Sequence, residues 1–143
     1  MATERRSCAD RRRTTTVVVV DEEPMIRTVL AQTLASGGVD VVGQADSGED
    51  AIEFALKLCP DVVLTGIRLP GMSGVETIEQ LALLAPASCV LVLTNSEQNQ
   101  VVEAIIAGAN GYILRTAPPE EIIAAVIATA AGEACSPPKS PGN

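Results

Sequence analysis

Five short runs of aliphatic residues recur along the chain, each separated from the next by a stretch long enough for a helix. They lie at residues 16–20, 39–43, 62–65, 90–93 and 111–114. Parallel strands need crossover connections, usually helices, so strands that alternate with helices predict a parallel sheet. The runs are apolar almost throughout, which is typical of strands covered on both faces. The chain is therefore predicted to be an α/β protein with a doubly wound, five-stranded parallel sheet.

Capping and helix-breaking residues stand where the intervening helices should begin and end. Ser73 and Glu76 form the S-x-x-E pattern of a capping box. Proline is favoured in a first helical turn, and glycine is favoured just after a last turn. The predicted helix starts are Pro24, Ser47, Ser73, Ser96 and Pro118–Pro119, and the predicted ends are Gly37, Gly108 and Gly132.

The distribution of charge argues against nucleic-acid binding by the body of the protein. The 143 residues carry a net charge of −8, yet residues 1–16 contain five Arg against Glu4 and Asp10. The remaining chain is strongly acidic and should repel phosphate backbones. With one Phe, one Tyr and no Trp, it also lacks an aromatic platform on which bases could stack.

Composition suggests three parts. Residues 1–15 form a basic tail that is predicted to be disordered, although such a tail could also touch nucleic acid or an acidic partner. Residues 16–133 are long enough for one domain with its own core. Residues 134–143 are rich in Pro, Ser and Gly and are typical of a linker or frayed terminus.

The sequence predicts a cytoplasmic protein without a membrane span. No apolar run reaches the 18 or so residues that a spanning helix needs. The four cysteines show no C-x-x-C spacing and the chain has no His, so a zinc site is not predicted and the thiols are expected to be reduced.

The residues at the carboxyl ends of the strands are the candidate functional residues, because ligands of open parallel sheets bind there. They are Asp21, Glu22, Gly66, Thr94 and Arg115. Two adjacent carboxylates repel each other unless a cation joins them, so Asp21 and Glu22 could form half of a metal site. A solvated acidic loop is the alternative.

Four segments, VVVVDEEPMIRTVL, PDVVLTGIRLPGMSGVE, VLVLTNS and GANGYILR, together resemble the receiver domain of two-component response regulators. The resemblance covers residues 16–133, and it is strongest to the branch in which a helix-turn-helix DNA-binding domain follows. It implies a flavodoxin-like (βα)5 fold with strand order 2-1-3-4-5. It also implies an acid pair that binds Mg²⁺, a phosphoacceptor aspartate after strand three, a Thr and a Lys that contact the phosphate, and an aromatic switch residue.

This chain matches that pattern at four positions and departs from it at two. Asp21 and Glu22 fall on the acid pair, Thr94 on the hydroxyl and Tyr112 on the aromatic switch. Gly66 occupies the phosphoacceptor position, and Arg115 occupies the position of the lysine.

Glycine cannot accept a phosphoryl group, because the reaction needs a side-chain oxygen nucleophile. Asp61 cannot replace it, since five residues of strand separate the two by roughly 16 Å. Thr65 should point to the opposite face of the sheet. We therefore expect no phosphoaspartate at residue 66, no catalytic residue and no enzymatic activity. Mg²⁺ also loses one ligand, so binding at Asp21 and Glu22 should be weak or absent.

Arg115 could compensate for the missing metal. Its guanidinium is longer than a lysine ammonium and suits carboxylates, so it could reach Asp21 or Glu22. An arginine that points into solvent is the alternative.

The last helix is apolar on more than one stripe, which suggests a surface for pairing. The sequence predicts a homodimer through Ile122, Ile123, Val126 and Ile127. Together these features predict an atypical response-regulator receiver that acts by phosphorylation-independent dimerisation or partner binding, as the regulatory half of a DNA-binding transcription regulator. A small-ligand sensor that uses the degenerate acidic pocket is the alternative.

Overall fold

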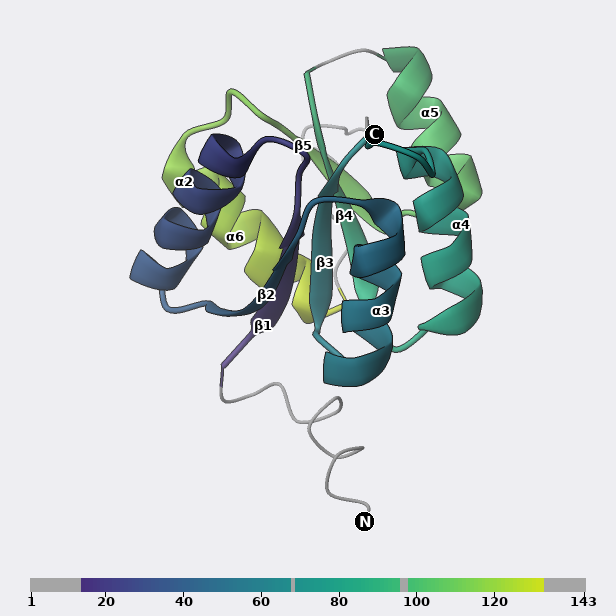
Figure 1. Ribbon diagram of the computed structural model, residues 1–143. Coiled ribbons are helices and arrows are strands. Elements are labelled where there is room, and N and C mark those ends of the chain that lie inside the picture. Colours follow the sequence, from purple (N-terminus) through teal and green to yellow (C-terminus); the bar gives the residue numbers. More distant parts are fainter. Residues whose placement is uncertain (1–13, 68, 96–97, 133–143) are drawn as a thin grey trace.

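One five-stranded parallel sheet forms the centre of the molecule (Figure 1). The computed structural model describes residues 14–67, 69–95 and 98–132. The strand order is β2-β1-β3-β4-β5, which confirms the predicted fold and strand order. The strands are β1 (Thr16–Val20), β2 (Asp40–Ala45), β3 (Val62–Gly66), β4 (Cys89–Thr94) and β5 (Gly111–Leu114).

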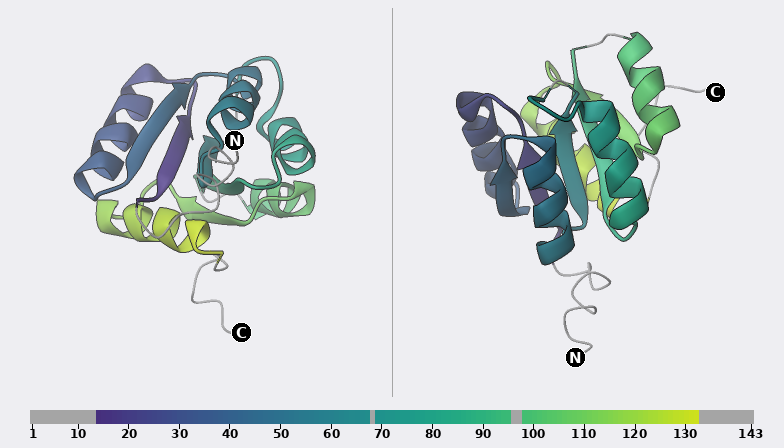
Figure 2. Two further views of the ribbon diagram at one scale, coloured as in Figure 1. Left: turned by 90° about the horizontal axis from the view of Figure 1, so that it is seen from below. Right: turned by 45° about the vertical axis from the view of Figure 1, so that its right-hand side comes forward.

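Helices cover both faces of the sheet, as a doubly wound fold requires. Two helices, α2 and α6, lie on one face, and α3, α4 and α5 lie on the other (Figures 1 and 2). The bounds are α2 (Pro24–Ser36), α3 (Gly48–Leu58), α4 (Gly74–Leu84), α5 (Gln98–Ala107) and α6 (Pro119–Ala130).

The predicted capping residues act locally as expected. The Ser47 hydroxyl accepts a hydrogen bond from the backbone N–H of Asp50 at 3.2 Å. Ser73 and Glu76 form the reciprocal capping box, with distances of 3.1 and 3.2 Å. Pro24 occupies the first turn of α2. Ser96 lies outside the described residues.

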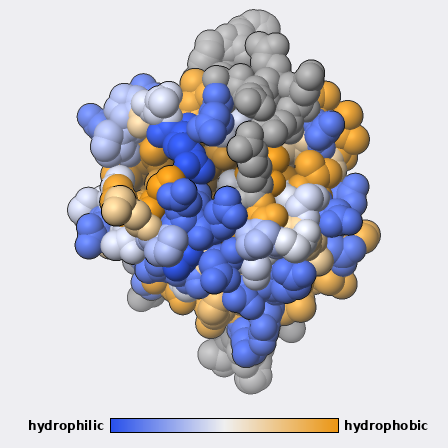
Figure 3. All heavy atoms as spheres, turned by 45° about the horizontal axis from the view of Figure 1, so that its top comes forward, coloured by the Kyte–Doolittle hydropathy of each residue, from blue (hydrophilic) through white to orange (hydrophobic). Residues whose placement is uncertain are grey.

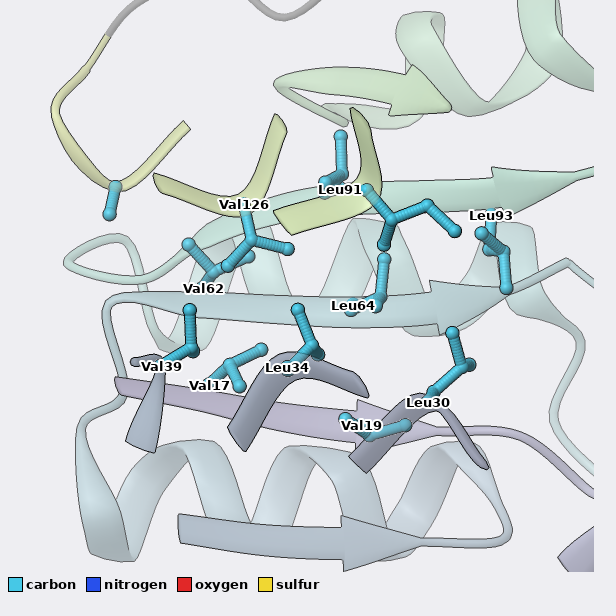
Figure 4. Close-up of a cluster of buried hydrophobic side chains, with 12 residues drawn as sticks. Val17, Val19, Leu30, Leu34, Val39, Val62, Leu64, Leu91, Leu93 and Val126 are labelled. Atoms are coloured by element: carbon cyan, nitrogen blue, oxygen red, sulfur yellow. The ribbon is translucent and has the colours of Figure 1, made fainter. Parts of the chain in front are cut away.

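Aliphatic side chains fill the space on each side of the sheet, in two clusters. Val17 and Val19 of β1 point toward α2 and α6, where they meet Leu34 and Val126 (Figure 4). The alternate residue Val18 points toward α3 and α4 on the other face. This alternation follows from the two-residue period of a strand. It also fixes the face of the sheet toward which the last side chain of each strand points.

The strand ends differ from the predicted ones by one or two residues. Strands β3 and β4 extend to Gly66 and Thr94, so these two residues end their strands rather than follow them. Strand β2 begins at Asp40 and continues to Ala45. The strand ends are defined by backbone hydrogen bonds, and a hydrophobic pattern does not predict where those bonds stop.

The state of Cys59 differs from the reduced thiol that was predicted. Cys59 caps the C-terminus of α3 in the left-handed conformation, with φ of 51°, and it is disulfide-bonded. The reduced state predicted for this thiol is therefore wrong. The predicted tail and linker, residues 1–15 and 134–143, lie almost wholly outside the described residues.

The last helix α6 is buried mainly against its own sheet. Ile122 and Val126 belong to the core cluster shared with α2, and Ile123 is half-buried against that cluster. Of the four residues predicted to form a dimer interface, Ile127 is the exposed one. The prediction was wrong for Ile122 and Val126, because a helix rich in alanine appears apolar all round even when one stripe suffices for its packing.

Candidate functional site

A polar pocket of about 180 Å³ lies at the carboxyl ends of the strands. Strand β1 lies between β2 and β3. The connection after β1 runs to β2 on one side, whereas the connection after β3 runs to β4 on the other, and ligands of open sheets bind at such a reversal. Hydrophilic side chains gather on the molecule's face at this edge (Figure 3). The pocket is lined by Asp21, Glu22, Glu23, Gly66, Ile67, Leu93, Thr94, Asn95 and Arg115.

Asp21 directly follows β1 and is only 3% exposed. Its backbone N–H donates to the carbonyl of Ala45 at the end of β2, at 3.0 Å. Its carboxylate oxygen Oδ1 accepts from the backbone N–H of Glu23 at 2.9 Å. Its carbonyl accepts from Nη1 of Arg27 at 2.8 Å. Asp21 is therefore held through its backbone N–H, its backbone carbonyl and one carboxylate oxygen.

Arg115 directly follows β5 and reaches across β4 and β3 to Asp21. Its Nη2 donates to Asp21 Oδ2 at 3.1 Å, and its side chain is 32% exposed while that of Asp21 is 4% exposed. Its backbone N–H donates to the carbonyl of Thr94 at 2.7 Å, which anchors the base of the side chain. Of the two acids predicted as partners, Asp21 makes the pair, and Glu22 is exposed at the rim.

Both carboxylate oxygens of Asp21 are thus occupied by donors from the protein itself. A buried carboxylate left without partners is costly, and removal of one member of a buried pair typically destabilises by about 3 to 5 kcal/mol. This pair is partly exposed on the arginine side, so its contribution lies below that range. The pair also joins two positions that are 94 residues apart in the sequence.

Gly66 leaves open space at the centre of the pocket. A Cβ atom built on it would lie 3.6 Å from Asp21 Oδ2 and 4.0 Å from Arg115 Nη2, which is ordinary contact. Its neighbour Thr65 is fully buried, and the Thr65 hydroxyl donates to the Gly66 carbonyl at 2.9 Å. Residue 66 therefore has no side-chain oxygen, and the Thr65 hydroxyl is already hydrogen-bonded to the Gly66 carbonyl.

Asp61 lies at the opposite edge of the sheet, at the start of β3. Its Oδ2 accepts from the backbone N–H of Thr16 at 3.0 Å, and its own N–H donates to the Thr16 hydroxyl at 2.9 Å. This aspartate fastens the start of β1 to the start of β3 and takes no part in the pocket.

Two buried polar atoms of the pocket make no hydrogen bond within the described part of the chain. They are the hydroxyl oxygen of Thr94 and Nε of Arg115. Thr94 is 3% exposed, so water does not readily compensate. An unsatisfied buried hydroxyl costs about 1 to 3 kcal/mol. The pocket therefore contains a buried hydroxyl that has no hydrogen-bond partner among the described residues.

Tyr112 is not among the residues that line the pocket. Its half-buried side chain packs against the core cluster on the α3, α4 and α5 face. The structure thus brings together five of the six predicted site residues, Asp21, Glu22, Gly66, Thr94 and Arg115, and leaves Tyr112 apart.

Arg27 and Glu23 were not predicted to belong to the site. Both hold Asp21 in place, one through its side chain and the other through its backbone. Arg27 carried a detectable signal, because a cation near a helix N-terminus opposes the helix dipole and usually has a specific partner. Glu23 carried none, since its contribution comes from the backbone.

The residues present do not fit the Mg²⁺ ion that the resemblance implies. Mg²⁺ needs several oxygen ligands in near-octahedral geometry at about 2.0 to 2.1 Å. Gly66 supplies none, and Arg115 holds the oxygen of Asp21 that faces the pocket. Within residues 14–67, 69–95 and 98–132, no group of three or more His, Cys, Asp or Glu residues is arranged to hold a metal.

Comparison with known proteins agrees with this architecture. The model of the response regulator receiver domain matches residues 17–127, which is most of the chain. This protein belongs to the response regulator receiver domain family. The predicted family is thereby confirmed.

Individual relatives are between a third and two fifths identical to this receiver domain over the matched residues. The nitrate/nitrite response regulator NarL of Escherichia coli strain K12 is 36% identical over 115 residues, which are 79% of this chain and 53% of that protein. The response regulator GacA of Pseudomonas aeruginosa is 38% identical over 115 residues, covering 79% and 54% of the two chains. The chain spans about half the length of these relatives.

A solved structure has the same fold at similar identity. The signal receiver domain of a response regulator NarL from Mycobacterium tuberculosis superposes with a TM-score of 0.80 and 34% identity, covering 84% of this chain and 98% of that one. No helix in the described part of this receiver domain has both the length and the apolar content to cross a bilayer.

Proposed function

We propose that this receiver domain regulates without accepting a phosphoryl group, through dimerisation or binding of a partner. It acts as the regulatory half of a cytoplasmic, DNA-binding transcription regulator. Relatives that are 36% and 38% identical to it over 115 residues are response regulators, and those 115 residues make up 53% and 54% of their lengths. A solved structure 26% identical to it is described as a two-component response regulator of the LuxR family. The domain is not an enzyme in this proposal.

The observation that carries the proposal is the open space at Gly66. Transfer of a phosphoryl group needs an oxygen nucleophile in line with the donor. The hydroxyl of Thr65 is buried and bonded to the Gly66 carbonyl, and Asp61 is bonded to Thr16 at the far edge of the sheet. No neighbouring oxygen on β3 is therefore in a position to attack.

Loss of the nucleophile changes what can control the domain. A ligand shifts a two-state equilibrium only through different affinities for the two states. Among the described residues the Thr94 hydroxyl has no hydrogen-bond partner. Without a phosphoryl group it is not drawn toward residue 66, and Tyr112 stays in its contact with the core cluster. The domain therefore holds one conformation, and its output depends on the concentration of a partner or of a second copy.

Exposed aliphatic residues offer the contacts for such a partner. Ile106 of α5 is 80% exposed, and Val102 and Ile105 of the same helix are also exposed, as is Ile127 of α6. Dimerisation through α6 itself would have Ile127 and small alanines to use, since Ile122 and Val126 are buried. The acidic body and the lack of aromatic residues argue against direct nucleic-acid binding by this domain.

Treatment with a small phosphodonor tests the proposal. The protein is incubated with acetyl phosphate and Mg²⁺, and its intact mass is measured. We expect no acid-labile adduct of about 80 Da, the mass of one added phosphate. An authentic aspartate-containing receiver, treated in parallel, is the positive control. An adduct that maps to residues 61–66 would overturn the proposal.

A small-ligand sensor is the second candidate, and the cavity favours it. About 180 Å³ of largely polar space opens beside Gly66, which is room for a small polar molecule. A ligand that binds only the folded state raises its stability by mass action. Thermal unfolding measured against a panel of polar metabolites distinguishes the candidates, because the first predicts no ligand-dependent shift.

A further inference from the structure

We propose that the guanidinium of Arg115 is the permanent cation of this pocket and keeps divalent metal ions away from Asp21. This inference rests on the proposed function and deepens it. It gives the two departures from the family pattern, Gly66 and Arg115, a common explanation. The pocket has exchanged a dissociable cation for one that is part of the chain.

The first argument is the occupation of Asp21. Its Oδ1 accepts from the N–H of Glu23 at 2.9 Å, and its Oδ2 accepts from Nη2 of Arg115 at 3.1 Å. A metal ion at Oδ2 would lie beside the guanidinium, because the arginine already uses one lone pair of that oxygen. The ion would approach that oxygen to about 2.1 Å, and the two cations would repel each other.

The second argument is the space at residue 66. The point at which a Cβ would lie is 4.0 Å from Nη2 of Arg115 and 3.6 Å from Asp21 Oδ2. A carboxylate side chain at this position would extend into the region between these two groups. Glycine leaves that region open, so no carboxylate at residue 66 competes with Asp21 for the guanidinium.

The third argument is competition. A cation tethered to β5 is always present at high effective concentration, whereas a free ion must be bound from solution. The guanidinium also offsets the negative charge of Asp21, which weakens the attraction for a second cation. Glu22 is exposed at the rim, and a single exposed carboxylate does not hold Mg²⁺ against its hydration shell.

The inference predicts that removal of the guanidinium creates a metal site. Asp21 and Glu22 are adjacent, and their mutual repulsion then favours a bridging divalent cation. In the Arg115→Ala variant Asp21 Oδ2 loses its partner and becomes available to the ion. The Tm of the unmodified protein should not change with divalent cations at the same concentration.

Thermal unfolding in Mn²⁺ and in Mg²⁺ tests this, at constant ionic strength. For the unmodified protein we expect no change in Tm at millimolar metal. For Arg115→Ala we expect a rise of about 2 to 4 °C, the shift for a metal concentration a few times above Kd. Lys57→Ala is the matched control, because it also removes one cation but from an exposed pair with Glu53, 3.4 Å apart on α3. Its Tm should not respond to metal.

Two further variants keep the result decisive. Arg115→Gln retains a donor for Asp21 without the charge and serves if Arg115→Ala does not fold. Asp21→Asn combined with Arg115→Ala should lose the metal response. Paramagnetic resonance of Mn²⁺ then counts the bound ion directly.

Two outcomes would overturn the inference: a metal response in the unmodified protein equal to that of Arg115→Ala, or a folded Arg115→Ala protein with no bound Mn²⁺. Either is separable from failure of the proposed function. Phosphorylation of the unmodified protein is read by mass, whereas exclusion of metal is read by Tm and resonance.

Discussion

Gly66 lines the pocket and Gly74 lies against the pocket residue Ile67, and the two positions are glycine for different reasons. Gly74 opens α4, and a Cβ on it would overlap the backbone carbonyl of Ile67. Its N–H donates to that same carbonyl at 2.9 Å. Gly66 ends β3, and a Cβ on it would meet side-chain atoms at ordinary contact distances of 3.6 and 4.0 Å. The fold requires the first glycine and merely accepts the second.

The difference shows that the missing nucleophile is not a by-product of packing. Where the backbone of one segment approaches another closely, only glycine fits. At residue 66 no such approach exists, so a side chain could stand there without moving the backbone. The absence of a carboxylate at Gly66 therefore bears on function rather than on folding.

The largest expected effect is that of Gly74→Ala. The added methyl collides with a backbone atom that cannot rotate away, so the free energy of unfolding should fall by about 2 to 3 kcal/mol. Gly66→Ala is the matched control, and it should change stability by less than about 1 kcal/mol, with a gain favoured because glycine weakens a strand. Urea unfolding followed by circular dichroism measures both. Equal losses for the two variants would erase the distinction between the glycines.

The fold was predictable from the sequence because the hydrophobic runs and the helix-start signals indicate the same alternation of strands and helices. The strand positions follow from the valine-rich runs, and the helix starts follow from Pro24, Ser47 and the Ser73–Glu76 box. Dimer contacts were less predictable. Ile122 and Ile127 are the same residue type on the same helix, yet one is buried and the other exposed, and only the rotation of the helix against the sheet distinguishes them.

The site was predictable in its membership but not in its contacts. Because strand ends meet at one edge, Asp21, Gly66, Thr94 and Arg115 were expected together, and they line one pocket. The choice of Asp21 over Glu22 as partner of Arg115 depends on which carboxylate points inward. The role of Arg27 depends on a bond to a carbonyl oxygen. Neither is encoded in residue type or spacing.

A smaller effect is expected for Gly66→Asp. The new carboxylate fits sterically but shares one guanidinium with Asp21, so the free energy of unfolding should fall by about 1 kcal/mol at low salt.

In the double variant Gly66→Asp, Arg115→Lys, both departures from the family pattern are reversed. We expect it to gain a Mg²⁺-dependent adduct of about 80 Da from acetyl phosphate. A folded double variant that stays unmodified would show that something besides these two residues disables the pocket.

The smallest effect, and the most specific, is expected for Thr94→Val. The Thr94 hydroxyl is buried and makes no hydrogen bond within the described part of the chain, so its removal should leave stability unchanged or raise it by up to about 1 kcal/mol. The control is Thr77→Val, because Thr77 is equally buried but its hydroxyl donates to the Ser73 carbonyl at 2.8 Å. That variant should lose about 1 kcal/mol. If Thr94→Val is instead the more damaging of the two in urea unfolding, the hydroxyl has a partner in solution, and the pocket is a working one despite Gly66.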